Sequence, residues 1–312
     1  MSQAAHGTHD FTPDPRNATI LINVNGQLVP RDQAVVSVFD SGFLMGDGVW
    51  EGLRVSAGHP AFLERHLDRL WEGAAAIALD IGRTRQELTA EIYRTLNAND
   101  MHGDGVHVRL MVTRGPKSTP YQDPRVSDGP ATLVIIAEHK EPLPARVERG
   151  LSLFTVHVRR SRPDSLDPKL NAHSKLNDIT ACIQAYTAGA DEALMLDPDG
   201  FVATCNSTNF FIVRGDEVWT STGMYSLAGI TRSNVLRLCE RNGIPAHERA
   251  FSLTEVYSAD EAFVTGTFAG VVPVHTVDGR RIGTGARGPM VERLQSLYVA
   301  FVGEDVSARH AP

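Results

Sequence analysis

The sequence predicts an α+β fold, with a small N-terminal α/β domain followed by a larger, barrel-like C-terminal domain. Segments with strand and helix patterns are mixed along the chain without regular βαβ alternation. The 312 residues, 42% of them hydrophobic, suffice for one large core or two modest ones. A segment rich in proline and charge, EPLPARVERG, separates the halves. We expect a mobile N-terminal arm over 1–19, a small domain over 20–140, a linker over 141–149 and the large domain over 150–305.

Strands and two helices follow one another in the N-terminal half. Asn25-Gly26 is typical of a hairpin turn, and Thr84 with Glu87 three residues later has the spacing of a capping box. The segment 131–140 is apolar enough for a central strand. We expect a hairpin over 20–30, a strand over 35–43, a strand pair over 48–62 that turns at Gly58, helices over 62–80 and 84–100, and strands over 106–115 and 131–140.

The C-terminal half alternates hairpins with helices. The turn 197–200 (Asp-Pro-Asp-Gly) has a strong turn composition, and Asn242-Gly243 is a typical end of a helix. The segment 176–188 carries one apolar stripe at helical spacing. We expect a strand over 151–159, a helix over 176–188, hairpins over 192–204 and 209–221, a helix over 230–243, a strand over 260–267 and a helix over 289–302.

Composition argues against several classes of protein. A net charge of −7 without a basic cluster argues against a nucleic-acid partner. The three cysteines are far apart and form no CxxC pair, and no histidines have metal-ligand spacing, so no metal site is expected. No apolar run is long enough for a membrane span, and the first residues lack the apolar core of a secretory signal. Reduced thiols favour a cytoplasmic location.

Six short motifs appear in an order and spacing that resemble one enzyme family. They are FDSGFLMGDGVWEGLR (39–54), HLDRL (66–70), VTRG (112–115), STNFFIV (207–213), LAGITR (227–232) and ADEAFVTGT (259–267). With them the chain resembles the class IV, or branched-chain-type, pyridoxal-phosphate-dependent aminotransferases of fold-type IV. The resemblance covers nearly the whole chain.

The resemblance implies a pyridoxal 5'-phosphate enzyme. It would move an amino group between an amino acid and a 2-oxo acid through a lysine Schiff base, with branched-chain-like L-amino acids favoured. A homodimer is implied as well. The same fold also occurs in D-amino-acid transaminases and aminodeoxychorismate-type lyases, which are therefore alternatives.

The resemblance assigns the cofactor phosphate to three places in the sequence. Arg69 corresponds to the arginine of the family's HxxRL motif, and a guanidinium suits phosphate oxygens. Ile230 and Thr231 open a helix, where unpaired N–H groups and the helix dipole favour an anion. Thr267 in the Thr-Gly-Thr turn would add a hydroxyl and an N–H group.

The lysine and the partner of the ring nitrogen depart from the family pattern. An ungapped count places the family's lysine at Asn171, whereas Lys175 and Lys169 lie nearby; we favour Lys175, with Lys169 as the alternative. The family's glutamate, five residues before Asn209, is replaced by Thr204. Because threonine carries no charge, it cannot stabilise a protonated ring, so a catalytically degenerate cofactor-binding relative is a further alternative.

Candidate substrate contacts come from three motifs. Arg54 and Arg114 correspond to arginines that contact substrate in different branches of the family, and either could pair with a carboxylate. Trp50 lies where the family has an aromatic pocket wall. Phe268 and Ala269 belong to a turn whose backbone N–H groups could hold a carboxylate.

Overall fold

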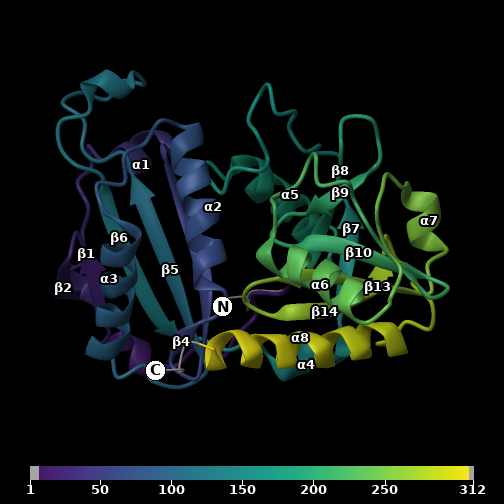
Figure 1. The fold of residues 1–312 in the computed structure, drawn as a ribbon. Coiled ribbons are helices and arrows are strands. Elements are labelled where there is room, and N and C mark those ends of the chain that lie inside the picture. Colours follow the sequence, from purple (N-terminus) through teal and green to yellow (C-terminus); the bar gives the residue numbers. More distant parts are fainter. Residues whose placement is uncertain (1–6, 309–312) are drawn as a thin grey trace. The chain divides into compact units, whose positions relative to one another are not determined.

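The computed structural model describes residues 7–308, which form two compact units (Figure 1). The small unit comprises 13–141, 170–175 and 302–312. The large unit comprises 1–12, 142–169 and 176–301. None of the helices in the described residues is long and apolar enough to span a bilayer.

The small unit is built on a six-stranded sheet with the order β2-β1-β6-β5-β3-β4. The strands are β1 (Leu21–Val24), β2 (Gln27–Pro30), β3 (Gly48–Ser56), β4 (His59–Pro60), β5 (Val106–Thr113) and β6 (Thr132–His139). All pairs within it are antiparallel, and β1 and β2 are joined by the expected Asn25-Gly26 turn. The apolar strand predicted over 131–140 is β6, which lies inside the sheet as expected.

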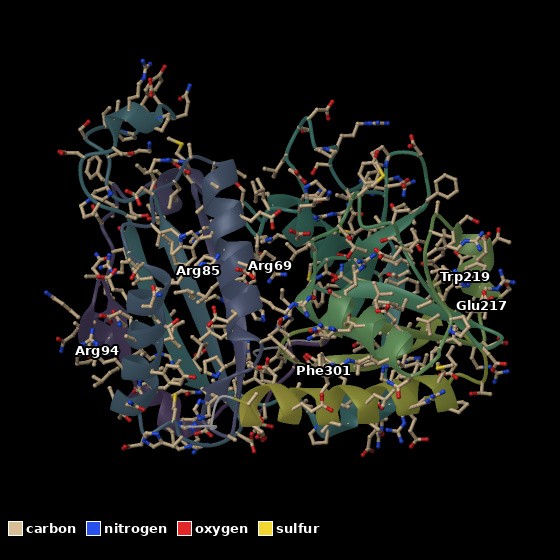
Figure 2. The ribbon with its side chains drawn as sticks, viewed as in Figure 1. Arg69, Arg85, Arg94, Glu217, Trp219 and Phe301 are labelled. Atoms are coloured by element: carbon tan, nitrogen blue, oxygen red, sulfur yellow. The ribbon has the colours of Figure 1, made fainter. Side chains whose placement is uncertain are left out.

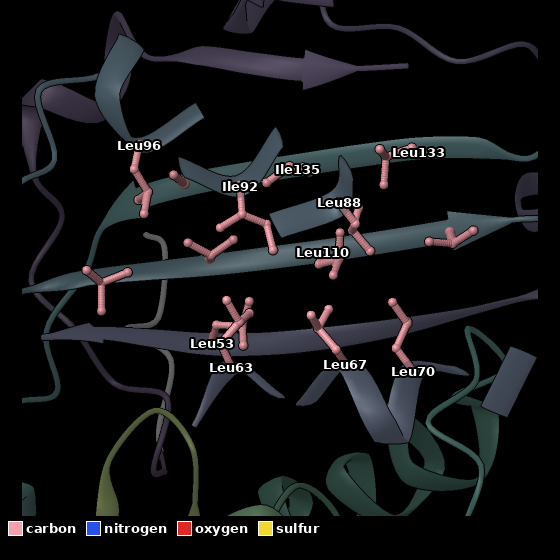
Figure 3. Packing of buried hydrophobic residues seen from close by; sticks show 14 of the residues in the cluster. Leu53, Leu63, Leu67, Leu70, Leu88, Ile92, Leu96, Leu110, Leu133 and Ile135 are labelled. Atoms are coloured by element: carbon pink, nitrogen blue, oxygen red, sulfur yellow. The ribbon is translucent and has the colours of Figure 1, made fainter. Parts of the chain in front are cut away.

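Two amphipathic helices, α2 (Leu63–Ala76) and α3 (Arg85–Ala98), contribute to the core of this sheet (Figure 3). Leucines of α2, together with Leu88, Ile92 and Leu96 of α3, join one cluster with alternate residues of β3, β5 and β6. The predicted capping box opens α3: the Thr84 hydroxyl accepts from the Glu87 N–H, and the Glu87 carboxylate accepts from the Thr84 N–H. Short elements complete the unit: η1 (Pro15–Ala18), η2 (Arg31–Gln33), α1 (Ser41–Met45) and η3 (Pro124–Val126).

The large unit contains a nine-stranded sheet with the order β12-β11-β10-β13-β14-β7-β8-β9, and β15 pairs with β14. Its strands are β7 (Leu151–Thr155), β8 (Glu192–Leu196), β9 (Val202–Cys205), β10 (Asn209–Arg214), β11 (Glu217–Thr220), β12 (Ala246–Glu248), β13 (Glu261–Gly266), β14 (Gly270–Val277) and β15 (Arg280–Arg281). Strand β9, at one end of this order, also contacts β10, which indicates that the sheet curves toward closure in the expected barrel-like form.

The helices of the large unit are α4 (Pro144–Arg149), α5 (Leu176–Thr187), α6 (Ile230–Arg241), α7 (Leu253–Tyr257) and α8 (Pro289–Ser307), the last of which enters the small unit at Val302. One core cluster lies between the sheet and helices α6 and α8, and it includes the stacked rings of Phe211 and Phe263. The segment expected as a linker over 141–149 thus contains a helix, α4.

One strand prediction is wrong. The segment 35–43 was expected to be a strand, but it contains only an isolated bridge from Asp40 to Pro116 and then enters helix α1. The Asp40 carboxylate accepts from the Gly42 N–H and so caps this helix. Val35 and Val38 are largely exposed, so the apolar residues whose alternation favoured a strand are not part of a core formed by the described residues.

The N-terminal segment also differs from the mobile arm expected over 1–19, of which 1–6 lie outside the described residues. Thr8, Asp10 and Asn17 are buried. The Asn17 side-chain amide donates to the His139 carbonyl and accepts from the His139 N–H, so this part of the segment is bonded to β6. The polar composition that suggested mobility is therefore used in specific hydrogen bonds.

Candidate functional site

The start of α6 in the large unit presents backbone N–H groups of the kind that bind anions. Gly229 precedes the helix and contributes no side-chain cap, so the first N–H groups of α6 remain available. A Cβ atom at Gly229 would lie 2.0 Å from Asn209 Oδ1, which explains why a glycine stands here. The Asn209 amide also donates to the Leu227 carbonyl over 3.1 Å and holds the loop before the helix.

The turn between β13 and β14 is packed beside this helix start. Residues 267–269 connect the paired Gly266 and Gly270. A Cβ atom at Gly270 would lie 3.1 Å from the Tyr298 ring, and the Tyr298 hydroxyl lies 3.3 Å from Thr231 Oγ1. Tyr298 of α8 therefore contacts both the turn and the helix start, the two places where a phosphate group was expected.

Two buried hydroxyl groups near these elements have no hydrogen-bond partner among residues 7–308. They are Ser226 Oγ, in the loop before α6, and Thr265 Oγ1, at the end of β13. Leaving a buried hydroxyl unpaired costs roughly 1–3 kcal/mol. Such groups, together with the N–H groups of α6, fit a ligand that carries several hydrogen-bond acceptors, as a phosphate does.

Thr204 and Asn209 lie side by side at the loop between β9 and β10. The Thr204 hydroxyl is buried and donates to the Thr208 carbonyl over 2.8 Å. The nearest buried carboxylate along this network is that of Glu192, which accepts from the Thr208 hydroxyl and from the N–H and hydroxyl of Thr8. Burial raises the pKa of Glu192, although these hydrogen bonds oppose the rise. The Glu192 carboxylate is thus bonded to Thr8 and Thr208 and not to the Thr204 side chain.

Arg69 lies on α2 (Figure 2), and a buried carboxylate of the small unit holds its side chain. Its Nε and Nη2 atoms donate to the two oxygens of Glu51 over 2.7 and 2.6 Å, and His66 Nδ1 lies 2.6 Å from the same carboxylate. The bidentate pairing fixes the plane of the guanidinium.

The charge states of this trio follow from burial and pairing. Burial acts to raise the pKa of Glu51, but the Arg69 charge and the hydrogen bonds from His66 and Arg69 outweigh it and lower the pKa to about 2. Burial lowers the pKa of His66 although Glu51 opposes the shift. At neutral pH we therefore infer an ionised Glu51 between a cationic Arg69 and a neutral His66.

Trp50, expected as a pocket wall, gathers two cations of the small unit around its ring. The Arg109 guanidinium lies 3.7 Å from the ring centroid and the Lys175 amine 5.5 Å. The Arg109 side chain makes no hydrogen bond or ion pair within the described residues, and burial lowers its pKa. A partly buried guanidinium over an aromatic face, without a paired anion, is suited to a carboxylate ligand.

Asn171, at the place of the family's lysine, is committed to the backbone of β3. Its side-chain amide donates to the Trp50 carbonyl over 2.6 Å, and its own carbonyl accepts from the Trp50 N–H. Its buried Oδ1 atom has no partner in the described chain. Lys175, four residues later, directly precedes α5, whereas Lys169 is exposed. Of the two candidate lysines, the structure brings Lys175 to Trp50.

The two arginines expected to contact substrate have different surroundings. Arg114 donates to both Asp47 oxygens over 2.7 and 3.0 Å and to the carbonyls of Ile77 and Ala78, which uses most of its donors within the small unit. Arg54 belongs to β3. Neither residue shares the position of Arg109 over the Trp50 ring.

Sequence reasoning missed Arg109, Glu51, Tyr298 and the two unpaired hydroxyls of Ser226 and Thr265. Arg109 could have been found by register, because it is the charged residue in the apolar strand 106–113 and points to the opposite face from Val108 and Leu110. The role of Tyr298 had no sequence signal, since it depends on how α8 packs.

The chain matches the family model described as "Amino-transferase class IV" over residues 48–277. Among relatives, it is 44% identical over 92% of its length to the branched-chain-amino-acid aminotransferase-like protein 2 of Arabidopsis thaliana and covers 51% of that protein. It is 39% identical to a putative branched-chain-amino-acid aminotransferase of Methanocaldococcus jannaschii, over 89% of this chain and 94% of that one. The D-alanine aminotransferase of Bacillus licheniformis is 32% identical over 87% of this chain and 93% of that protein.

The chain spans about half the length of the Arabidopsis relatives that it matches. A solved structure of the branched-chain amino acid aminotransferase from Thermobaculum terrenum, in its PLP-bound holo-form, superposes with a TM-score of 0.81, at 26% identity, over 94% of this chain and 97% of that one. The predicted α+β fold is thereby confirmed as fold-type IV. The chain belongs to the class IV aminotransferases, a family of transaminases that use pyridoxal 5'-phosphate.

Proposed function

We propose that this protein transfers an amino group between an amino acid and a 2-oxo acid with pyridoxal 5'-phosphate as cofactor, and that branched-chain-like L-amino acids are its preferred donors. The observation that carries the proposal is the anion-binding element of the large unit. It combines the uncapped start of α6 at Ile230 and Thr231 with the adjoining Thr267 turn and unpaired buried hydroxyls. These groups fit the phosphate of the cofactor.

The remaining cofactor contacts are proposed residue by residue. Arg69, oriented by Glu51, would contact the phosphate, as the resemblance implies. Thr204 and Asn209 would face the ring nitrogen, where they supply only neutral groups. Lys175 would supply the amine of the Schiff base. When bound, the cofactor provides an electron-accepting ring that weakens the bonds at the amino acid Cα atom.

Lys175 is also proposed to move the proton at the Cα atom. Its amine lies near the electron-rich face of Trp50, which stabilises the charged form. Arg109 lies over the same ring. A lysine amine held at this place would accept the proton from the Cα atom and return it.

Substrate carboxylates would be recognised by Arg109 and by the turn at Phe268 and Ala269. Arg109 is preferred to Arg114 because the donors of Arg114 are largely used by Asp47 and two carbonyls. Trp50, next to Arg109, would form an apolar wall for an aliphatic side chain. Arg54 remains a candidate on the same strand as Trp50.

A homodimer is proposed as well. Four apolar side chains of α5 are exposed: Leu176, Ile179, Ile183 and Tyr186. Several apolar side chains in the segment before β3 are exposed as well. An apolar stripe of the kind on α5 is typical of an interface. A cytoplasmic location, expected from the reduced thiols, stays a prediction.

Two other functions have specific support. A D-amino-acid transaminase is favoured by the similarity to D-alanine aminotransferases. A cofactor-binding relative without turnover is favoured by the neutral Thr204 and by Asn171, whose side chain is bonded to Trp50. An aminodeoxychorismate-type lyase remains an alternative on the resemblance alone.

The test is reduction of the protein with borohydride in the presence of pyridoxal 5'-phosphate, followed by peptide mapping. We expect the label on Lys175 in the parent protein and in Lys169→Ala, and its loss in Lys175→Ala. Transamination of L- and D-amino acids with 2-oxoglutarate and with pyruvate is measured in parallel. Saturating cofactor binding without any label or turnover would contradict the aminotransferase proposal and support the non-catalytic relative.

A further inference from the structure

The segment 7–12, here called the N-terminal strap, lies against two parts of the large unit. It belongs to that unit but precedes the 48–277 range that matches the family model. Its Thr8 and Asp10 residues are buried in spite of their polarity. A buried polar strap is costly unless its groups are bonded, so its contacts indicate what it holds in place.

The first contact is a hydrogen-bonded anchor at Glu192. The N–H and hydroxyl of Thr8 both donate to one oxygen of the Glu192 carboxylate, and the Thr208 hydroxyl donates to the other. Gly7 has φ +112 and packs so closely on Asp191 that a Cβ atom would lie 3.1 Å from its carbonyl oxygen. The anchor therefore connects the strap to the loop that carries Thr204 and Asn209.

The second contact is an aromatic stack on the turn between β13 and β14. The His9 ring lies parallel to the Phe268 ring, with centroids 5.5 Å apart and an angle of 6° between the planes. His9 is exposed whereas Phe268 is 3% exposed, so the histidine covers the phenylalanine. Tyr298 supports the same turn at Gly270. Contact on the turn thus comes from the strap as well as from α8.

We propose that the N-terminal strap is a positioning element for amino-acid recognition, in which His9 fixes the turn 267–269 through Phe268. The inference rests on the proposed function, since it takes this turn as the place of the substrate carboxylate. The strap bonds to Glu192 and stacks on Phe268, whereas Thr231 and the start of α6 are supported by Tyr298 and Asn209. Loss of the stack should therefore weaken substrate binding more than cofactor binding, because α6 contributes to the phosphate site without the turn.

The experiment compares His9→Ala with His9→Phe, which keeps a flat ring, in protein loaded with cofactor. We expect His9→Ala to raise KM for the amino acid roughly two- to tenfold, as loss of one aromatic stack implies, with kcat within about twofold of the parent value. The dissociation constant for pyridoxal 5'-phosphate should change less than KM does. His9→Phe should restore the parent KM.

A second readout does not depend on turnover. Hydrogen exchange of the amides of residues 267–270 is measured in cofactor-loaded parent, His9→Ala and His9→Phe proteins. Faster exchange in His9→Ala alone would support the strap, even if the parent protein lacked transaminase activity and the proposed function failed. Unchanged exchange in His9→Ala, or an unchanged KM in an active protein, would contradict the positioning role of the N-terminal strap. Neither result would contradict the proposed function.

Discussion

At the scale of single residues, Arg69 joins a role in folding with the proposed role at the cofactor phosphate. Its guanidinium neutralises the buried Glu51, and that pairing holds the guanidinium in one plane. An effect of mutation on cofactor affinity is therefore combined with an effect on folding. The two can be separated by changing the carboxylate together with the arginine.

Arg69→Ala should lower the free energy of unfolding by about 3–5 kcal/mol, because it leaves the Glu51 charge buried without its cation. The double variant Arg69→Ala with Glu51→Gln should recover part of this loss, because the unpaired charge is gone. Urea denaturation without cofactor measures both. If cofactor affinity stays at the parent value in the folded double variant, Arg69 does not bind the phosphate.

Thr204 is the residue through which the electronic state of the cofactor ring can be tested. Thr204→Glu should raise transamination about tenfold or more if this position faces the ring nitrogen, since a carboxylate stabilises the protonated ring. The position is buried, so the variant should also be less stable without cofactor. Thr204→Gln, with a side chain of similar size to glutamate but uncharged, is the control. Equal rates in the two variants would show that charge at this position does not matter.

At the scale of elements, the contact between β3 and α2 makes the stability of the small unit dependent on pH. Glu51 has a pKa of about 2 in the folded chain, below its ordinary value of 4.5. The folded state therefore binds protons less readily than the unfolded state. The stabilisation is fully present above pH 4.5 and is lost as the pH falls through 4.5 toward 2.

We expect Glu51 to contribute roughly 3 kcal/mol to the acid-sensitive part of stability. Urea denaturation of cofactor-free protein between about pH 7 and about pH 3 measures it. Glu51→Gln should be less stable at neutral pH and should lose less stability on acidification than the parent. Parallel curves for the two proteins would show that another group dominates the acid transition.

Helices and strands were predicted correctly where neighbouring residues in the sequence determine them. The capping box at Thr84, the Asn25-Gly26 hairpin and the uncapped start of α6 were evident because neighbouring residues determine them. The strand expected over 35–43 was wrong because Asp40 caps a helix and the valines before it are exposed. Alternation alone does not say whether a partner strand exists.

The candidate site was predictable where a motif fixes a residue on its own element. Thr231 and Thr267 were proposed in this way, and the structure places them at the start of α6 and in the turn after β13. The pairing of Arg114 with Asp47, and that of Arg69 with Glu51, could not, because each joins residues from different elements whose packing sets the partner. The sequence marks Arg109 as the charged residue of an apolar strand, but its place over Trp50 depends on the register of β5 against β3.

At the scale of the whole molecule, the described residues leave an apolar stripe on α5 exposed. Its core-facing residues are Ala181 and Ala185, while Ile179, Ile183 and Tyr186 are at least half exposed. The helix is thus apolar on two sides. A second copy of the chain would cover the outer side.

Ile183→Asp should therefore shift the protein from dimer to monomer, because it places a charge in the middle of the stripe. Size-exclusion chromatography with light scattering measures the mass. Val299→Asp is the matched control, since Val299 is an exposed apolar residue of another helix, α8. A parent protein that is already monomeric, or a dimeric Ile183→Asp variant, would place the interface elsewhere.

The three cysteines give this chain a built-in reporter for the same surface. Cys205 and Cys239 are buried, and burial raises the pKa of both thiols, so alkylating reagents reach them slowly. Cys182 is exposed and lies on α5 directly before Ile183. Cys182 can therefore be labelled without an engineered cysteine. If a second copy of the chain covers α5, the labelling rate of Cys182 should fall as the protein concentration rises.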